Sequence, residues 1–183
     1  MRQTTLAMAL AAAAAIGLAG SPAQATFETP EAKLTAQAAA ELAREEMEET
    51  FGKSSLENGR FVLKDSFGKG GVTRVVISLS DQLAYAYRDD ELVGVSTISS
   101  GKDEKPTPTG IFPILEKKRF HRSFKYENAP MPFMMRLDDY GIALHAGQLP
   151  GHPASHGCVR LPATFASRLY AATDIGTEVL IGT

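Results

Sequence analysis

Residues 141–162 read GIALHAGQLPGHPASHGCVRLP and hold three of the four histidines and the only cysteine of the chain. A cysteine becomes a nucleophile when a neighbouring base or positive charge stabilises its thiolate, and an imidazole is the commonest such group. His145 and His156 are both candidates for that base. The chain offers no second cysteine for an internal disulfide, so this thiol points to chemistry at Cys158.

A short alternating segment places the first of these histidines. Ile142 and Leu144 alternate with polar or small residues as in a strand, so His145 should project from a rigid strand edge onto the face opposite to them. The glycines and prolines that follow break regular structure and give a loop that can return Cys158 to His145.

The residue before the cysteine favours a tight turn. Gly157 lacks a Cβ and lets the backbone turn sharply beside the nucleophile. The consecutive N–H groups of residues 156–158 could then aim at a developing oxyanion.

Two separated segments carry a resemblance to a known family. The segment SHGCVR at 155–160, preceded by the strand histidine, and the segment KPTPTGIF at 105–112 resemble the two recurrent signatures of the L,D-transpeptidase catalytic domain (YkuD type). With the strand-rich region that begins at Val72 and the ending GTEVLI, the likeness covers roughly residues 72–182.

The resemblance implies a role for each matching position. Cys158 would be the acyl-accepting nucleophile, and His145 would be its proton acceptor. The remaining implied roles are an oxyanion hole at His156 and Gly157, and substrate contacts or loop ordering at Ser155, Ala146 and Arg160, with the Ala146 carbonyl orienting the His145 ring. Two departures concern the acceptor preference: many members have Asn where this chain has Arg160, and the loop from 146 to 154 is shorter than in many members.

The rest of the chain predicts a mainly β fold. Runs rich in Val, Ile, Tyr and Thr indicate strands, and Asp89-Asp90 indicates a hairpin turn; the expected strands cover residues 72–79, 82–88, 91–99, 111–116, 133–137, 141–145 and 178–181. Pro162 opens a helix with apolar residues at 165, 169 and 172. The expected architecture is a small β-sandwich or partly closed barrel with one or two peripheral helices.

The N-terminal region divides into two parts. Arg2, an apolar alanine-rich run and the triplet Ala23-Gln24-Ala25 are typical of a secretory signal peptide, residues 1–25. The alternative is an uncleaved membrane anchor, for which the apolar run is short. Residues 26–58 are predicted to form a helical extension and linker, with Thr29 as N-cap. The acidic helix carries a thin stripe of Leu34, Ala38 and Leu42, which suits either weak docking on the catalytic domain, residues 59–183, or a solvated spacer.

Charge excludes one class of partner. The formal net charge is −2, which argues against a nucleic-acid surface despite the basic, aromatic segment at 117–126. That segment is either a flap that attracts an acidic peptide or a solvated loop whose aromatic side chains fix it to the core. No feature of the sequence specifies an oligomeric state.

The resemblance implies an exported, periplasmic enzyme without a cofactor, which removes the terminal D-Ala of a peptidoglycan tetrapeptide stem through a cysteine thioester and cross-links diaminopimelate residues. An L,D-carboxypeptidase, or a transferase that attaches a protein or D-amino acid to peptidoglycan, would use the same residues. Two other hypotheses remain: a zinc site built from His145, His152, His156 and Cys158, and a catalytically silent wall-binding protein.

Overall fold

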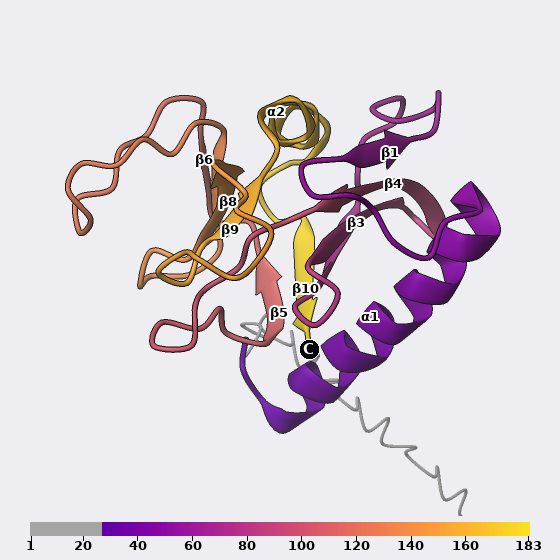
Figure 1. The fold of residues 1–183 in the computed structure, drawn as a ribbon, viewed down its shortest axis with the longest axis horizontal. Coiled ribbons are helices and arrows are strands. Elements are labelled where there is room, and N and C mark those ends of the chain that lie inside the picture. Colours follow the sequence, from indigo (N-terminus) through magenta and orange to yellow (C-terminus); the bar gives the residue numbers. More distant parts are fainter. Residues whose placement is uncertain (1–26) are drawn as a thin grey trace, which may run out of the picture.

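The computed structural model describes residues 27–183 and shows two open β-sheets and two helices (Figure 1). The predicted signal peptide lies outside the described residues. The first sheet has the strand order β1 (Phe61–Leu63), β4 (Glu91–Thr97), β3 (Leu83–Arg88), β2 (Arg74–Ser78), β10 (Glu178–Gly182) and β5 (Gly110–Pro113). The second has the order β6 (Glu116–Lys118), β7 (Met134–Arg136), β8 (Ala143–Ala146) and β9 (Val159–Leu161).

Neighbouring strands run antiparallel except β2 with β10 and β8 with β9, which are parallel. The mainly β class and the N-terminal helix are confirmed. Neither sheet closes on itself, so the barrel alternative does not describe the fold.

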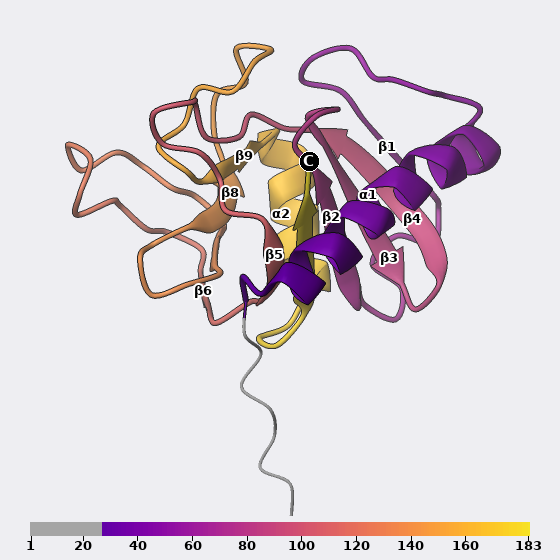
Figure 2. The same cartoon turned by 90° about the horizontal axis from the view of Figure 1, so that it is seen from below.

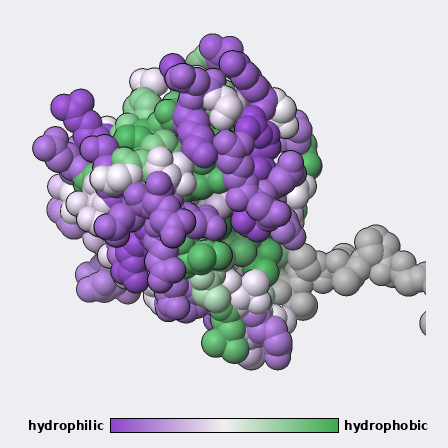
Figure 3. Space-filling view, turned by 90° about the vertical axis from the view of Figure 1, so that its right-hand side faces the viewer, coloured by the Kyte–Doolittle hydropathy of each residue, from purple (hydrophilic) through white to green (hydrophobic). Residues whose placement is uncertain are grey.

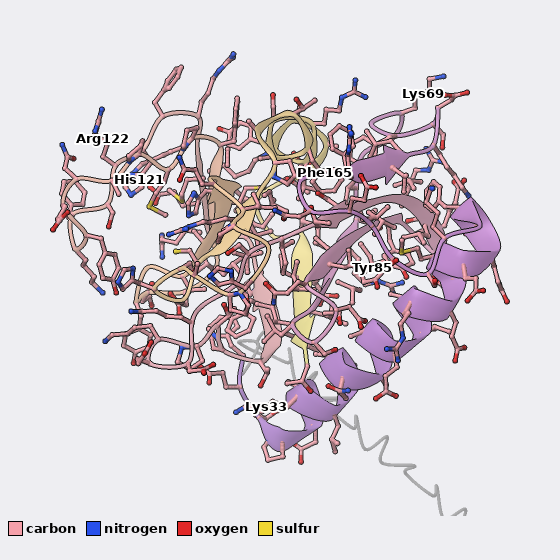
Figure 4. The ribbon with its side chains drawn as sticks, viewed as in Figure 1. Lys33, Lys69, Tyr85, His121, Arg122 and Phe165 are labelled. Carbon is pink, nitrogen blue, oxygen red and sulfur yellow. The ribbon has the colours of Figure 1, made fainter. Side chains whose placement is uncertain are left out.

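The main core lies between the two sheets and beneath α2 (Ala163–Ala172). Phe165 and Leu169 of α2 are fully buried against side chains from both sheets, which include Leu144 of β8 and Val159 of β9. Figure 4 shows Phe165 below α2. The two strands that frame the candidate site are therefore anchored on their inner face by a well-packed apolar layer.

The helix α1 (Pro30–Phe51) begins at its predicted N-cap, Thr29. The Thr29 hydroxyl accepts a hydrogen bond from the N–H of Ala32 at 3.2 Å, and Pro30 occupies the first turn. Gly52 ends the helix in the left-handed region with φ 62°, and its N–H donates to the Glu48 carbonyl at 2.9 Å.

The buried face of α1 is not the predicted one. Leu34 and Leu42 are 71% and 54% exposed, whereas the buried positions are Ala36, Ala40, Ala43 and Met47. Because each helical residue turns the chain by about 100°, this face lies nearly opposite the predicted stripe. The helix buries its small side chains because the facing side chains of the sheet are large. They include Tyr85 and Tyr87.

The alanine face lets α1 approach the sheet very closely. A Cβ added to Gly182 of β10 would lie 2.6 Å from the Ala36 carbonyl oxygen, so only glycine fits there. Figure 2 shows α1 crossing the strands on one side of the first sheet, with α2 on the other side. Hydrogen bonds at the edges fix its position: Tyr87 Oη donates to Glu46 at 2.6 Å, and the Thr183 N–H donates to Gln37 at 2.8 Å.

The outer face of α1 is mostly charged but includes the exposed Leu34 and Leu42. Seen from the side of its C-terminal end, the surface is mostly polar with smaller hydrophobic areas (Figure 3). Within residues 27–183, no helix is both long and apolar enough to cross a bilayer.

Two short strands, β1 and β9, are absent from the prediction. β1 and β9 have only three residues each, too few for an alternating pattern to emerge. The predicted strand 111–116 divides into β5 and β6, which belong to different sheets. The stretch from 52 to 60 contains no strand or helix but is tied down, since Asn58 Nδ2 donates to the Leu149 carbonyl at 2.7 Å.

Candidate active site

The strands β8 and β9 bring the predicted base and nucleophile onto one face of the second sheet. In their parallel register Leu144 pairs with Val159, and His145 pairs with Arg160. Leu144 and Val159 face the core, so His145 and Arg160 point to the opposite face. Cys158 lies just before β9, two residues from Arg160, and shares that face. β8 lies between β7 and β9, so His145 projects from an inner strand, not from an edge.

His145 is buried, with 7% of its surface exposed, and its ring is held by one hydrogen bond. Nδ1 lies 2.8 Å from the Ala146 carbonyl oxygen. Because a carbonyl only accepts, Nδ1 carries the proton and Nε2 is left free to accept one. Burial lowers the pKa of His145 to about 4; the Ala146 bond opposes this shift, and the positive charge of Arg160 adds to it. The imidazole is therefore neutral at neutral pH.

The thiol of Cys158 is half-buried against Met131, Met134 and Ala143. Sγ donates to the Gly141 carbonyl at 3.5 Å, and no hydrogen bond within the described range joins it to His145. Burial raises the pKa of the Cys158 thiol; the Ala143 amide opposes that effect, and the Asp138 carboxylate reinforces it.

The thiol and the imidazole are near enough to meet. The β8–β9 register places Cys158 beside Ala143, two residues before His145 on the neighbouring strand. Strand spacing puts their Cα atoms about 8 Å apart. The thiol and the imidazole therefore project from neighbouring positions on one face of the sheet.

The turn before the cysteine is built for glycine. Gly157 has φ +110°, and a Cβ there would lie 2.6 Å from Cδ1 of Ile142. Its N–H donates to Ser155 Oγ at 3.0 Å, and the same hydroxyl donates to the Cys158 carbonyl. Ser155 is buried and thus braces the turn. Because the Gly157 N–H already donates to Ser155, the amides of His156 and Cys158 are the two predicted oxyanion donors that are still available.

The second histidine of the signature faces away from the thiol. The exposed ring of His156 stacks on Tyr126, with centroids 4.4 Å apart and planes at 23°. Tyr126 belongs to the flap, residues 119–133, a loop between β6 and β7 closed by backbone hydrogen bonds such as Met131 N–H to the His121 carbonyl at 2.9 Å. His156 therefore connects the cysteine loop to the flap.

The flap forms a hollow between its own two arms. A cavity of about 320 Å³ is lined by Phe120, His121, Arg122, Pro130 and Pro132. His121 and Arg122 lie together on the projecting flap in Figure 4. The Ala146 N–H donates to the Pro132 carbonyl at 2.9 Å, so the base of the flap is joined directly to the end of β8.

Arg160 is fixed by its backbone and leaves its charge available. Its N–H and C=O exchange hydrogen bonds with Ser99 at 2.9 and 3.0 Å. A Cβ on Gly147 would lie 3.0 Å from the Arg160 side chain, which crosses the start of the loop. Among the described residues, no carboxylate forms an ion pair with its guanidinium.

Sequence reasoning missed two buried side chains that shape the site. Asp138 accepts hydrogen bonds from the N–H groups of Gly141 and Ile142 at 2.7 and 2.8 Å, which sets the turn whose carbonyl faces the thiol. Thr107 donates to the Gly157 carbonyl at 2.8 Å. An Asp three residues before a Gly is a turn signal that could have identified Asp138, whereas the contact of Thr107 spans fifty residues of sequence.

The four residues of the zinc hypothesis do not converge. In the part of the chain that the structure describes, no three His, Cys, Asp or Glu side chains lie close enough together to hold a metal ion. His152 is exposed, and its carbonyl accepts from Ser99 Oγ at 2.8 Å. His145 is hydrogen-bonded to the Ala146 carbonyl, whereas His156 stacks on Tyr126.

Comparison with known proteins points to one family. The family model of the L,D-transpeptidase catalytic domain (YkuD) matches residues 72–181. Among solved structures, an L,D-transpeptidase from Mycobacterium tuberculosis H37Rv is 26% identical with a TM-score of 0.57, over 61% of this chain and 58% of that one. The L,D-transpeptidase of Xylanimonas cellulosilytica is 29% identical with a TM-score of 0.55, over 62% and 61%.

An L,D-transpeptidase from Stackebrandtia nassauensis is 26% identical with a TM-score of 0.56, over 62% of this chain and 56% of that one. The chain thus spans less than two thirds of the length of these structures. No curated protein matched the sequence. The family match covers both signatures, the strands that carry them and the helix beneath them, and the chain belongs to the L,D-transpeptidase catalytic domain family.

Proposed function

We propose that this protein is an exported peptidoglycan L,D-transpeptidase in which Cys158 is the nucleophile and His145 the general base. The observation that carries the proposal is the pairing of β8 with β9, which puts a buried imidazole with a free Nε2 on the same face as the only thiol of the chain. The family match supports the reaction class.

The reaction begins from a neutral pair. Burial lowers the pKa of His145 and raises the pKa of Cys158, so both groups are uncharged at neutral pH. The proton would therefore leave Sγ for Nε2 as the sulfur attacks, rather than beforehand. Attack on the carbonyl before the terminal D-Ala forms the carbon–sulfur bond and a tetrahedral oxyanion. His145 then gives its proton to the leaving amine as the carbon–nitrogen bond breaks, and a thioester remains.

A second stem peptide completes the cycle. Its amine attacks the thioester carbonyl, His145 accepts a proton from that amine, and the proton returns to Sγ as the carbon–sulfur bond breaks. The product is a cross-link between two diaminopimelate residues. If water replaces the amine, the same site releases a tripeptide and acts as an L,D-carboxypeptidase; a D-amino acid or a protein amine would make it another transferase.

The charged groups near the thiol suit an acidic peptide. Arg160 presents an unpaired guanidinium on the same face as His145, and Arg122 lines the flap cavity. Carboxylates of a peptidoglycan stem would be attracted to both. This supports the interpretation of the basic segment as a substrate-facing flap. The signal peptide predicted for residues 1–25 would place the enzyme in the periplasm, where this substrate lies.

The test is product analysis by mass spectrometry after mixing the mature protein, from Thr26, with purified tetrapeptide muropeptides. Dimers formed with loss of D-Ala would establish cross-linking, and tripeptide monomers alone would establish the carboxypeptidase. Cys158→Ala should abolish both products and leave the melting temperature unchanged. Products that persist in Cys158→Ala would refute the assigned nucleophile, and unchanged substrate with the native protein would refute the proposed reaction with this acceptor.

A further inference from the structure

Thr107 lies in the segment 105–112, fifty residues before the cysteine turn, and only 5% of its surface is exposed. Its hydroxyl makes two hydrogen bonds at once. Oγ1 donates to the Gly157 carbonyl at 2.8 Å and accepts from the Gly101 N–H at 2.9 Å. The Gly101 bond leaves the hydroxyl proton free for Gly157, so the direction of the contact is defined.

Holding the Gly157 carbonyl also fixes the next amide. The peptide bond between Gly157 and Cys158 is planar and trans, so the Cys158 N–H points opposite to the Gly157 carbonyl. With the carbonyl directed at buried Thr107, that N–H is directed away from it. Within residues 27–183 no hydrogen bond uses the Cys158 N–H.

Two other backbone groups of this turn are already hydrogen-bonded. Ser155 Oγ accepts from the Gly157 N–H and donates to the Cys158 carbonyl. Gly157 itself, with φ +110°, lacks the steric restriction that would hold a peptide plane in place. The orientation of the Cys158 amide therefore depends on hydrogen bonds from side chains. Thr107 is the side chain that bonds to the Gly157–Cys158 peptide group.

We infer that Thr107 is a positioning residue for acylation, which orients the Gly157–Cys158 peptide so that the Cys158 N–H donates to the oxyanion formed when Cys158 attacks. The inference rests on the proposed nucleophilic role of Cys158. It gives the segment 105–112 a function in the reaction although Thr107 does not touch the thiol. A donor held in advance stabilises the oxyanion far more than one that must reorient.

The inference is tested by comparing two reactions of the single thiol in the full mature protein. Acylation by p-nitrophenyl acetate passes through a tetrahedral oxyanion: the carbon–sulfur bond forms, the ester bond breaks and p-nitrophenolate is released. Alkylation by iodoacetamide displaces iodide at a saturated carbon and forms no oxyanion. Only the first reaction should depend on Thr107.

Thr107→Val keeps the shape of the side chain but removes the hydroxyl. We expect its acylation rate to fall about 10- to 100-fold, while its alkylation rate stays close to that of the native protein. Thr107→Ser, which keeps the hydroxyl, should restore most of the acylation rate. Thr109→Val is the matched control: it makes the same change two residues away, at a half-buried side chain, and should acylate at the native rate.

Circular dichroism melting of each variant shows whether it is folded, and Thr107→Ala replaces Thr107→Val if the latter is not. Unchanged acylation in Thr107→Val would overturn the inference. So would acylation and alkylation falling together, because that pattern indicates general damage to the site, or failure of Thr107→Ser to recover. A native protein that is acylated by the ester but leaves muropeptides unchanged refutes the proposed substrate and leaves this comparison intact.

Discussion

The contact between α1 and the first sheet and the turn that precedes β9 are both fixed firmly to the molecule, but by different interactions. The helix is held by the burial of alanines and Met47 against large apolar side chains of the sheet. The turn is held by individual hydrogen bonds: the Thr107 hydroxyl donates to the Gly157 carbonyl, and Ser155 Oγ accepts from the Gly157 N–H. The helical contact is spread over many atoms, whereas each bond at the turn sets the direction of one peptide group.

This difference separates stability from reactivity. Burial of apolar area is non-directional, so the helix contact contributes free energy but does not aim any group at the site. A hydrogen bond contributes only about 1 kcal/mol but fixes direction. Substitutions under α1 should therefore lower the stability of the protein without changing the reactivity of the folded fraction. Substitutions at the turn should change the reactivity of the thiol and leave the stability nearly unchanged.

The largest expected effect comes from placing a charge under α1. Ala40 is 2% exposed in the cluster that contains Tyr85 and Leu180. In Ala40→Asp an unpaired carboxylate would replace a methyl group there, and we expect the free energy of unfolding to fall by about 3 kcal/mol or more. Urea denaturation followed by circular dichroism measures this change.

The same helix provides the matched control. Ala38 is exposed, so Ala38→Asp changes the charge and the helix propensity equally but buries nothing. It should alter the free energy of unfolding by less than about 1 kcal/mol. Equal losses in the two variants would mean that α1 does not pack on the sheet through the face described above.

The fold was predictable where a pattern of residue types repeats along the sequence. The long strands β2, β3, β4 and β10 and the N-cap of α1 follow from patterns within a few residues of sequence. The buried face of α1 did not follow, because the largest apolar side chains, Leu34 and Leu42, suggested the wrong face. Alanine fits at this helix–sheet contact because the facing side chains of the sheet are large. The pattern of residues within the helix does not reveal the size of those side chains.

The candidate site divides in the same way. Cys158 and His145 stand out by residue type and by their signature segments. Thr107 and Asp138 act through backbone groups that are distant in sequence or hidden in a turn, and such residues look like ordinary polar positions. The commitment of the Gly157 N–H to Ser155 was also beyond reach, since it depends on which way a hydroxyl points in the folded turn.

A second, comparable effect concerns pH. His145 has a pKa of about 4 in the folded protein against 6.5 ordinarily. Between these values the unfolded chain binds the proton and the folded chain does not, so stability falls as the pH drops from 6.5 toward 4. The loss from this group is roughly 3 kcal/mol and is complete below pH 4. Urea denaturation at a series of pH values measures it.

His145→Gln should remove this part of the pH dependence. His152→Gln is the control, because His152 is exposed in the adjoining loop and its replacement should leave the slope between pH 4 and 6.5 as in the native protein. If both variants keep the native slope, the buried imidazole is not neutral in the folded state. Acylation by p-nitrophenyl acetate should likewise persist down to about pH 4, below which protonated His145 can no longer accept the thiol proton.

The smallest expected effect tests whether the charge of Asp138, besides its hydrogen bonds, affects the pKa of the Cys158 thiol. The negative Asp138 carboxylate raises the pKa of the Cys158 thiol, and its Oδ1 accepts from the Gly141 and Ile142 amides. Asp138→Asn keeps an acceptor for those amides but removes the charge. The thiolate should then form more readily, and the midpoint of the pH profile for iodoacetamide alkylation should move to lower pH.

Because Cys158 is the only cysteine, alkylation reports on that thiol alone. Asp139→Asn supplies the control: the Asp139 side chain is 94% exposed, and its removal deletes the same charge one residue further along. A shift in Asp138→Asn alone would show that the buried carboxylate acts on the thiol through a short, poorly screened path. Equal shifts in the two variants would instead assign the effect to the overall charge of the region, and no shift would leave the turn governed by hydrogen-bond direction alone.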